Sequence, residues 1–148
     1  MPKPYPTIIP GLRSPSEKVG GIVYFGRMLD KIRLNAEGKL PEEWAAMVGT
    51  GHEGSFDSRC CHFLGIAYAD IVAETIKGGS DDELLVWAFA KGRKPDAEDI
   101  EVWNAFMMKR GWRDAASQRV KIRLQEIGLE PDVVATMFEF IDLDEGRR

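Results

Sequence analysis

Apolar residues in this 148-residue chain recur every three or four positions, between residues that typically begin and end helices. Residues 80–83 read Ser-Asp-Asp-Glu, the pattern of a capping box, and glycines such as Gly65 and Gly128 stand where helices would end. The β-branched residues follow the same spacing rather than the two-residue period of a strand. The pattern therefore predicts an all-α fold of about seven helices with no β-sheet.

The first predicted helix organises the rest. Residues 14–17 (Ser-Pro-Ser-Glu) combine a capping box with proline at the first helical position, so we expect a helix from Pro15 to about Asn35. Gly20 and Gly21 inside it would cost about 1 kcal/mol each relative to alanine, which indicates close approach of a neighbouring segment. One broad arc of this helix is apolar and predicts a central, buried position: Ile22, Phe25, Met28, Leu29 and Ile32.

The prolines at positions 2, 4, 6 and 10 exclude a helix at the N-terminus, because each removes a backbone donor and restricts the residue before it. We therefore expect an extended proline-rich arm over residues 1–12. Residues 13–148 contain no repeat and no long linker, and their number suits one helical domain.

Composition excludes several classes of protein. Hydrophobic residues make up 44% and charged residues 30%, as in soluble globular domains, and the net charge of −4 argues against a nucleic-acid partner. No apolar run could span a membrane and no signal peptide is present, so we expect a cytoplasmic protein without a membrane partner. The only cysteines, Cys60 and Cys61, are adjacent, which excludes a disulfide framework and predicts reduced core residues.

Several short motifs are spread along the chain. They are residues 13–15, 20–21, 27–31, 64–66, 103–104 and 110–114, and the ending 138–147, Phe-Glu-Phe-Ile-Asp-Leu-Asp-Glu-Gly-Arg. As a set they resemble a bacterial group, domain-of-unknown-function family 5069, from about Leu12 onward. The resemblance implies a small bacterial, cytoplasmic protein, and it brings no activity, ligand or catalytic residue with it.

One segment concentrates zinc-ligand residue types: His52, Glu53, Asp57, Cys60, Cys61 and His62. On a helix, successive side chains point about 100° apart, so residues 60–62 cannot converge on one ion. We therefore predict no metal, although a site from His52, Asp57 and Cys61 remains an alternative. A second alternative is a reactive thiol, because Arg59 and His62 would lower the pKa of a neighbouring cysteine.

Charged residues on the first helix form the other candidate site. Arg27 and Lys31 are four positions apart and share a face with Tyr24, so together they could hold a carboxylate or phosphate. Asp30 lies on an apolar side and requires a partner: a helix N-terminus, Arg27 or a distant basic residue. The simpler interpretation is a structural ion pair between Arg27 and Asp30 that fixes the helix.

We expect Arg27, Asp30 and Lys31 to border a pocket that residues 52–59 cover, because the glycine-rich run 49–55 can move like a lid. No Walker loop, nucleophile elbow or dinucleotide fingerprint occurs, so no cofactor is predicted. The predicted function is a non-catalytic binding module for a small anionic ligand or a partner protein. The alternative is a small enzyme whose site joins residues 52–62 to the helix face at 27–31. The predicted ligand-binding residues are Arg27, Asp30, Lys31, His52, Glu53, Asp57 and Arg59.

Overall fold

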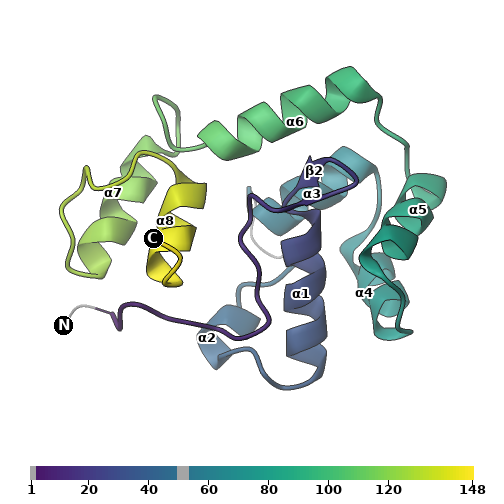
Figure 1. Ribbon diagram of the computed structural model, residues 1–148, viewed down its shortest axis with the longest axis horizontal. Coiled ribbons are helices and arrows are strands. Elements are labelled where there is room, and N and C mark those ends of the chain that lie inside the picture. The colour runs from purple at the N-terminus through teal and green to yellow at the C-terminus, as the bar shows by residue number, and fades with distance from the viewer. Residues whose placement is uncertain (1–2, 50–53) are drawn as a thin grey trace.

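The computed structural model of the protein describes residues 3–49 and 54–148, which form eight helices and one two-stranded antiparallel hairpin (Figure 1). The helical class predicted from the sequence is therefore confirmed. The elements are β1 (Lys18–Val19), β2 (Ile22–Val23), α1 (Phe25–Ala36), α2 (Glu42–Ala45), α3 (Phe56–Leu64), α4 (Tyr68–Ile76), α5 (Asp81–Lys91), α6 (Ala97–Lys109), α7 (Ser117–Glu126) and α8 (Met137–Asp144).

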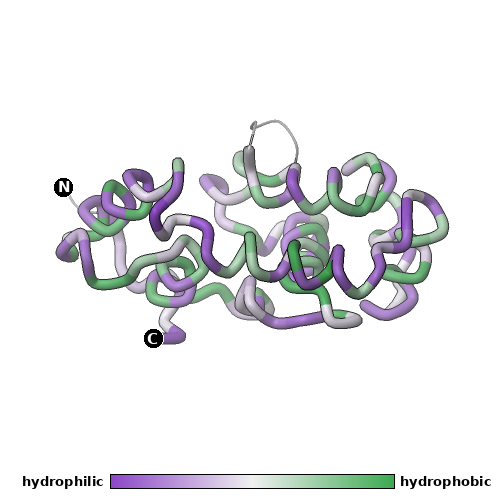
Figure 2. Tube along the Cα trace, turned by 90° about the horizontal axis from the view of Figure 1, so that it is seen from above, coloured by the Kyte–Doolittle hydropathy of each residue, from purple (hydrophilic) through white to green (hydrophobic). Residues whose placement is uncertain are grey.

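Helix α1 lies in the middle of an elongated body (Figure 1). It packs against α4 on one side, with α5 beyond it, while α7 and α8 form the opposite end. Helix α6 crosses the top, where it packs against both β2 and α8. The view from above shows hydrophilic and hydrophobic residues interleaved along the helices, as expected for helices with one face in a core (Figure 2).

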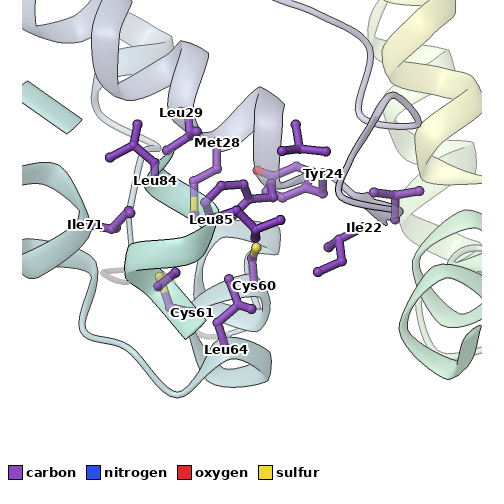
Figure 3. Packing of buried hydrophobic residues seen from close by; sticks show 14 of the residues in the cluster. Ile22, Tyr24, Met28, Leu29, Cys60, Cys61, Leu64, Ile71, Leu84 and Leu85 are labelled. Carbon is purple, nitrogen blue, oxygen red and sulfur yellow. The ribbon is translucent and has the colours of Figure 1, made fainter. Parts of the chain in front are cut away.

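The main core forms around α1. Ile22, Phe25, Met28 and Leu29 have no exposed surface and Ile32 retains 3%, so the predicted apolar arc is buried as expected. Figure 3 shows Met28 and Leu29 packed among residues of α3, α4 and α5. Two satellite clusters lie outside this core: one between α7 and α8, and one where the N-terminal arm meets the end of α1.

The first predicted helix was too long, and the prediction of no β-sheet was wrong. Gly20 and Gly21 have φ values of +56° and +82°, two consecutive left-handed residues that form a tight turn between β1 and β2. A side chain at Gly20 would collide with Leu85 of α5. The glycines therefore serve the hairpin turn and its close approach to α5, and α1 begins only at Phe25.

Tyr24, which links the hairpin to α1, is strained. Its φ of +75° lies in the left-handed region, where a bulky side chain is an outlier. Helix α6 holds this conformation in place: the Asn104 Oδ1 accepts the Val23 N–H at 3.1 Å, and the Trp103 indole N–H donates to the Val23 carbonyl at 3.1 Å.

Two later helices start further along the chain than predicted. Helix α7 was expected from about residue 113, but the Asp114 carboxylate accepts the Gly111 and Ala116 N–H groups and closes a turn there. The last helix was expected from Pro131 and begins at Met137, capped by Thr136 and Glu139 in a capping box. The described ranges hold eight helices rather than about seven, one of them the four-residue α2.

Residues 3–12 contain no helix or strand and run along the α7–α8 end of the molecule. The Lys3 N–H donates to the Glu126 carbonyl at 2.7 Å, and the Thr7 N–H donates to the Asp144 carbonyl at 2.6 Å. Ile9 and Leu12 are buried in the cluster at the end of α1. None of the helices within the described ranges has both the length and the apolar character needed to cross a membrane.

Candidate functional site

Helix α3 separates two cavities. Ser55 caps it by accepting the Ser58 N–H at 3.1 Å, and Gly65 ends it in the left-handed conformation. The helix then presents a different set of side chains to each surrounding region: Asp57 to one cavity, Arg59, His62 and Phe63 to another, and Cys60, Cys61 and Leu64 to the core (Figure 3).

The larger cavity, here called the arm cavity, has a volume of about 700 Å³ and lies between the N-terminal arm, α1, α2, α7 and α8. The described residues of its polar lining include four cations and six carboxylates, a formal balance of −2. The cations are Lys3, Arg27, Lys31 and Arg123, and the carboxylates are Glu42, Glu43, Asp57, Glu126, Asp144 and Glu145.

A buried polar cluster forms one wall of the arm cavity. The Tyr24 hydroxyl donates to Asp57 at 2.6 Å, and the Lys31 ammonium donates to both Tyr24 and Asp57 at 2.9 Å. The Gly49 N–H also donates to the Asp57 carboxylate, at 2.8 Å. Burial raises the pKa of Tyr24 well above its usual value and lowers the pKa of Lys31, although Asp57 opposes the second shift.

Arg27 is neutralised by a residue from the opposite end of the chain. Its two terminal nitrogens donate to the two carboxylate oxygens of Glu145 at 2.8 and 2.7 Å, and one also donates to the Arg13 carbonyl at 3.1 Å. Both side chains are nearly inaccessible, at 5% and 2% exposure. This bidentate geometry satisfies the guanidinium and leaves little of its charge for a ligand.

Asp30 takes part in a different network, away from the arm cavity. It accepts hydrogen bonds from Arg13 at 2.7 and 2.9 Å and lies 3.6 Å from Arg33. Asp81 at the start of α5 contacts both of these arginines, at 2.8 and 2.9 Å. The partner of Asp30 is thus a distant basic residue, one of the three alternatives, and the simpler Arg27–Asp30 pair does not form.

The smaller cavity, here called the arginine pocket, has a volume of about 680 Å³, and none of the described residues in its lining is a carboxylate. Its walls are Gly54, Ser58, Arg59, His62, Phe63, Arg93, Trp103 and Phe106. Phe63 and Trp103 stack in parallel with ring centroids 4.6 Å apart. The guanidinium carbons of Arg93 and Arg59 lie 5.1 Å from the Phe63 centroid and 5.2 Å from the Phe106 centroid, respectively.

The two guanidiniums of this pocket are held by aromatic rings and backbone rather than by tight ion pairs. The Arg59 Nε donates to the Gly54 carbonyl at 3.2 Å, and no carboxylate in the described ranges lies within 4.0 Å of its side-chain nitrogens. The Arg93 Nε donates to the Phe63 carbonyl at 2.7 Å, and one terminal nitrogen lies 3.3 Å from Asp99 outside the pocket. Among the described residues, Arg59 therefore has no carboxylate partner, and Arg93 has only Asp99, outside the pocket lining.

Cys60 and Cys61 face the core, with 0% and 3% exposure, and form no disulfide. Burial raises the pKa of Cys60 well above its usual value and that of Cys61 to about 12, so the thiols are not activated. Within residues 3–49 and 54–148, no group of three or more histidine, cysteine, aspartate or glutamate residues is placed to hold a metal. His52, which the alternative zinc set combines with Asp57 and Cys61, lies outside the described residues.

The structure divides the predicted site residues among three places. Arg27, Lys31 and Asp57 line the arm cavity, Arg59 lines the arginine pocket, and Asp30 lines neither. His52 and Glu53 lie outside the described residues. Sequence analysis missed Glu145 and the aromatic partners of Arg59 and Arg93, since no local spacing connects residues so far apart.

Residues 9–147 match a family described as Domain of unknown function (DUF5069). No curated protein gives a significant match to the chain.

Proposed function

Because the chain belongs to the DUF5069 family, whose function is not described, we propose a function from the cavities themselves. The protein is a non-catalytic binding module for a small anionic ligand, and that ligand binds in the arginine pocket. Buried, reduced cysteines fit a cytoplasmic location for this module. Its negative net charge argues against nucleic acid as the ligand.

One observation carries this proposal: Arg59 and Arg93 line the same pocket, whose described walls contain no carboxylate, and their guanidinium carbons lie over aromatic rings. A guanidinium held by an aromatic ring rather than by a carboxylate keeps N–H donors that can bind a carboxylate or phosphate. The two side chains also lose little freedom on binding, because the Nε of each already donates to a backbone carbonyl.

The pocket walls indicate what the rest of the ligand is like. Phe63, Trp103 and Phe106 supply apolar surface beside the two cations, and Ser58 adds a hydroxyl. The guanidiniums already cover ring faces of Phe63 and Phe106, so the pocket favours a compact ligand with a short apolar body over a large planar one. Small carboxylates and phosphate esters have this form.

The experiment is an amide and arginine side-chain NMR titration with inorganic phosphate and with succinate. We expect saturable chemical-shift changes at Arg59 and Arg93. We also expect both anions to bind about tenfold more weakly, or weaker still, to Arg59→Gln and to Arg93→Gln, since each variant loses a charged hydrogen bond. Arg119→Gln is the matched control, because it removes the same charge from an exposed position outside the pocket.

Equal weakening by all three variants would mean that the anions respond only to net charge, and would contradict the proposal. Shifts centred on Arg27 and Lys31 instead would transfer the anion site to the arm cavity. Circular dichroism of each variant checks that the fold is retained.

A small enzyme remains the second candidate, favoured by one observation. Asp57, from the segment 52–62, meets Lys31 and Tyr24 in the arm cavity, so an acid, an amine and a phenol converge beside open volume.

A further inference from the structure

We propose that Lys31 is a nucleophile that captures small, uncharged carbonyl compounds in the arm cavity as a protonated Schiff base. This site lies on the opposite side of α3 from the arginine pocket and does not depend on the proposed binding of anions there.

The amine of Lys31 is placed where a ligand could reach it. Lys31 lines the arm cavity, and its side chain keeps 13% exposure although its polar partner Asp57 keeps only 1%. A volume of about 700 Å³ is within the usual range for small-molecule sites. Lys31 is thus partly open to the cavity and otherwise enclosed.

Burial makes this amine easier to deprotonate than an exposed lysine. Burial lowers the pKa of Lys31 and the charge of Arg27 acts in the same direction, while Asp57 and Glu145 oppose the shift. The Asp57 carboxylate lies 2.9 Å from the Lys31 nitrogen and can accept its proton. A desolvated lysine is a recognised nucleophile in carbonyl chemistry.

The backbone conformation of Tyr24 supports a functional role for the cluster. Tyr24 adopts a left-handed φ of +75° while fully inside the protein, and its hydroxyl reaches both Lys31 and Asp57 from that position. Conformations of this kind persist only where the surroundings enforce them, and they concentrate at functional sites. Here the contacts of α6 with Val23 enforce it.

The reaction balances with no outside reagent. The Lys31 ammonium gives one proton to Asp57, and the nitrogen lone pair attacks the carbonyl carbon as the C–O π bond opens. A second proton moves from nitrogen to that oxygen and gives a carbinolamine. Asp57 returns its proton to the hydroxyl, the C–O bond breaks, water leaves, and the nitrogen lone pair forms the iminium double bond. Tyr24, whose pKa burial raises, stays a neutral phenol that orients the nitrogen and the carboxylate.

The charge of the product explains why a carbonyl compound suits this lysine. An iminium carries the same positive charge as the ammonium it replaces, so the buried ion pair with Asp57 is preserved. Acylation would instead neutralise Lys31 and leave the Asp57 carboxylate without a counter-charge in an enclosed site, which is strongly unfavourable.

The cavity lining selects against negatively charged carbonyl compounds. Its formal balance is −2, and Glu42, Glu43 and Asp144 form no ion pair within the described ranges. A keto acid would meet net repulsion, whereas an uncharged hydroxyaldehyde would find hydrogen-bond acceptors for its hydroxyl groups. We therefore assign the ligand class as small hydroxyaldehydes.

The test is reductive trapping of the full-length protein with glycolaldehyde and sodium cyanoborohydride, followed by intact mass and peptide mapping. We expect one hydroxyethyl group per chain, located on Lys31, at concentrations that leave exposed lysines unmodified. The exposed Lys39, with 67% exposure, is the internal reference within the same digest. Modification of Lys39 and other exposed lysines before Lys31 overturns the proposal, and because this comparison uses the unaltered protein it needs no variant.

Variants sharpen the result. Lys31→Arg keeps a cation opposite Asp57 but removes the amine, so the hydroxyethyl adduct that forms first should disappear. Lys39→Arg should leave that adduct unchanged. Tyr24→Phe keeps the ring and slows trapping about tenfold or more, since the amine loses one orienting hydrogen bond. Trapping at an unchanged rate in Lys31→Arg overturns the assignment.

Two further comparisons identify the ligand class and separate the two sites. Glyoxylate, an aldehyde of the same length that carries a carboxylate, should trap at least about fivefold more slowly at Lys31 than glycolaldehyde, relative to Lys39 in each case. Equal relative rates overturn the class assigned here. Arg59→Gln should leave the Lys31 adduct intact while weakening phosphate binding, so failure at one site is distinguishable from failure at the other.

Discussion

The two cavities on either side of α3 both contain arginine, but the arginine charge has different partners in each. In the arm cavity, Arg27 is held by both oxygens of Glu145, and the pair is almost completely enclosed. In the arginine pocket, Arg59 lies against Phe106 with no tight carboxylate partner among the described residues. A carboxylate fixes a guanidinium and cancels its charge, whereas an aromatic ring orients it and leaves the charge available. An arginine in a cavity is therefore a ligand-binding candidate only once its partners are known.

The largest effect should come from breaking the enclosed pair. Arg27→Met leaves Glu145 buried without its main counter-charge, and we expect a loss of about 3–5 kcal/mol in the free energy of unfolding. Arg59→Met loses a partly exposed stacking contact and should cost about 0.5–1 kcal/mol. Urea unfolding of both variants measures the difference.

The double variant Arg27→Met/Glu145→Met provides the control, because it removes both charges together. It should recover part of the stability lost in Arg27→Met. Similar losses for Arg27→Met and Arg59→Met would show that the contrast between the two cavities is not energetic.

The core side of α3 gives the next prediction. Because burial raises the pKa of Cys61 to about 12 from 9.0, its thiolate fraction near neutral pH should be about 1,000-fold below that of an ordinary cysteine. Iodoacetamide at pH 8 should leave both cysteines unmodified in the native protein and alkylate both in guanidinium chloride. Rapid alkylation of the native protein would restore the reactive-thiol alternative.

Acid should weaken the shared network of Arg13, Asp30, Arg33 and Asp81. Burial alone would raise the pKa of Asp81, but hydrogen bonds from Arg13 and Arg33 outweigh it and lower the pKa below 3.8. The stability this carboxylate contributes is therefore fully present above pH 3.8 and is lost as the pH falls through the lower, folded-state value. Thermal unfolding between pH 5 and pH 2 should show a smaller acid loss in Arg33→Gln than in the parent protein. Parallel curves of stability against pH for the two proteins would exclude Arg33 as a cause of the lowered pKa of Asp81.

The smallest effect should be a gain in stability. Asp144 lines the arm cavity, and burial together with the nearby Glu145 raises its pKa. Asp144→Asn removes this unfavourable charge and should stabilise the protein by about 0.5 kcal/mol at pH 7. Since Asp144 is protonated in both states at low pH, the gain should vanish as the pH falls toward 3.8, which differential scanning calorimetry can follow.

Local rules accounted for much of the fold but little of the site. Ser80 and Glu83 form the predicted capping box, and the apolar arc around Leu29 lies in the core, because both depend on residues a few positions apart. The hairpin was missed although its signal was present: two glycines between β-branched residues also form a two-residue turn. The Arg27–Glu145 pair had no local signal, and neither did the strained backbone of Tyr24, because distant segments impose both.

The distance along the chain between Arg27 and Glu145 bears on the order of events during synthesis. The two residues are 118 positions apart, so at typical elongation rates the ribosome adds Glu145 about 6 to 24 s after Arg27. Throughout that interval α1 cannot settle into its enclosed position without leaving a guanidinium uncompensated. We therefore expect chains truncated before residue 145 to remain open to protease at α1 after release, and released chains that contain Glu145 to be resistant.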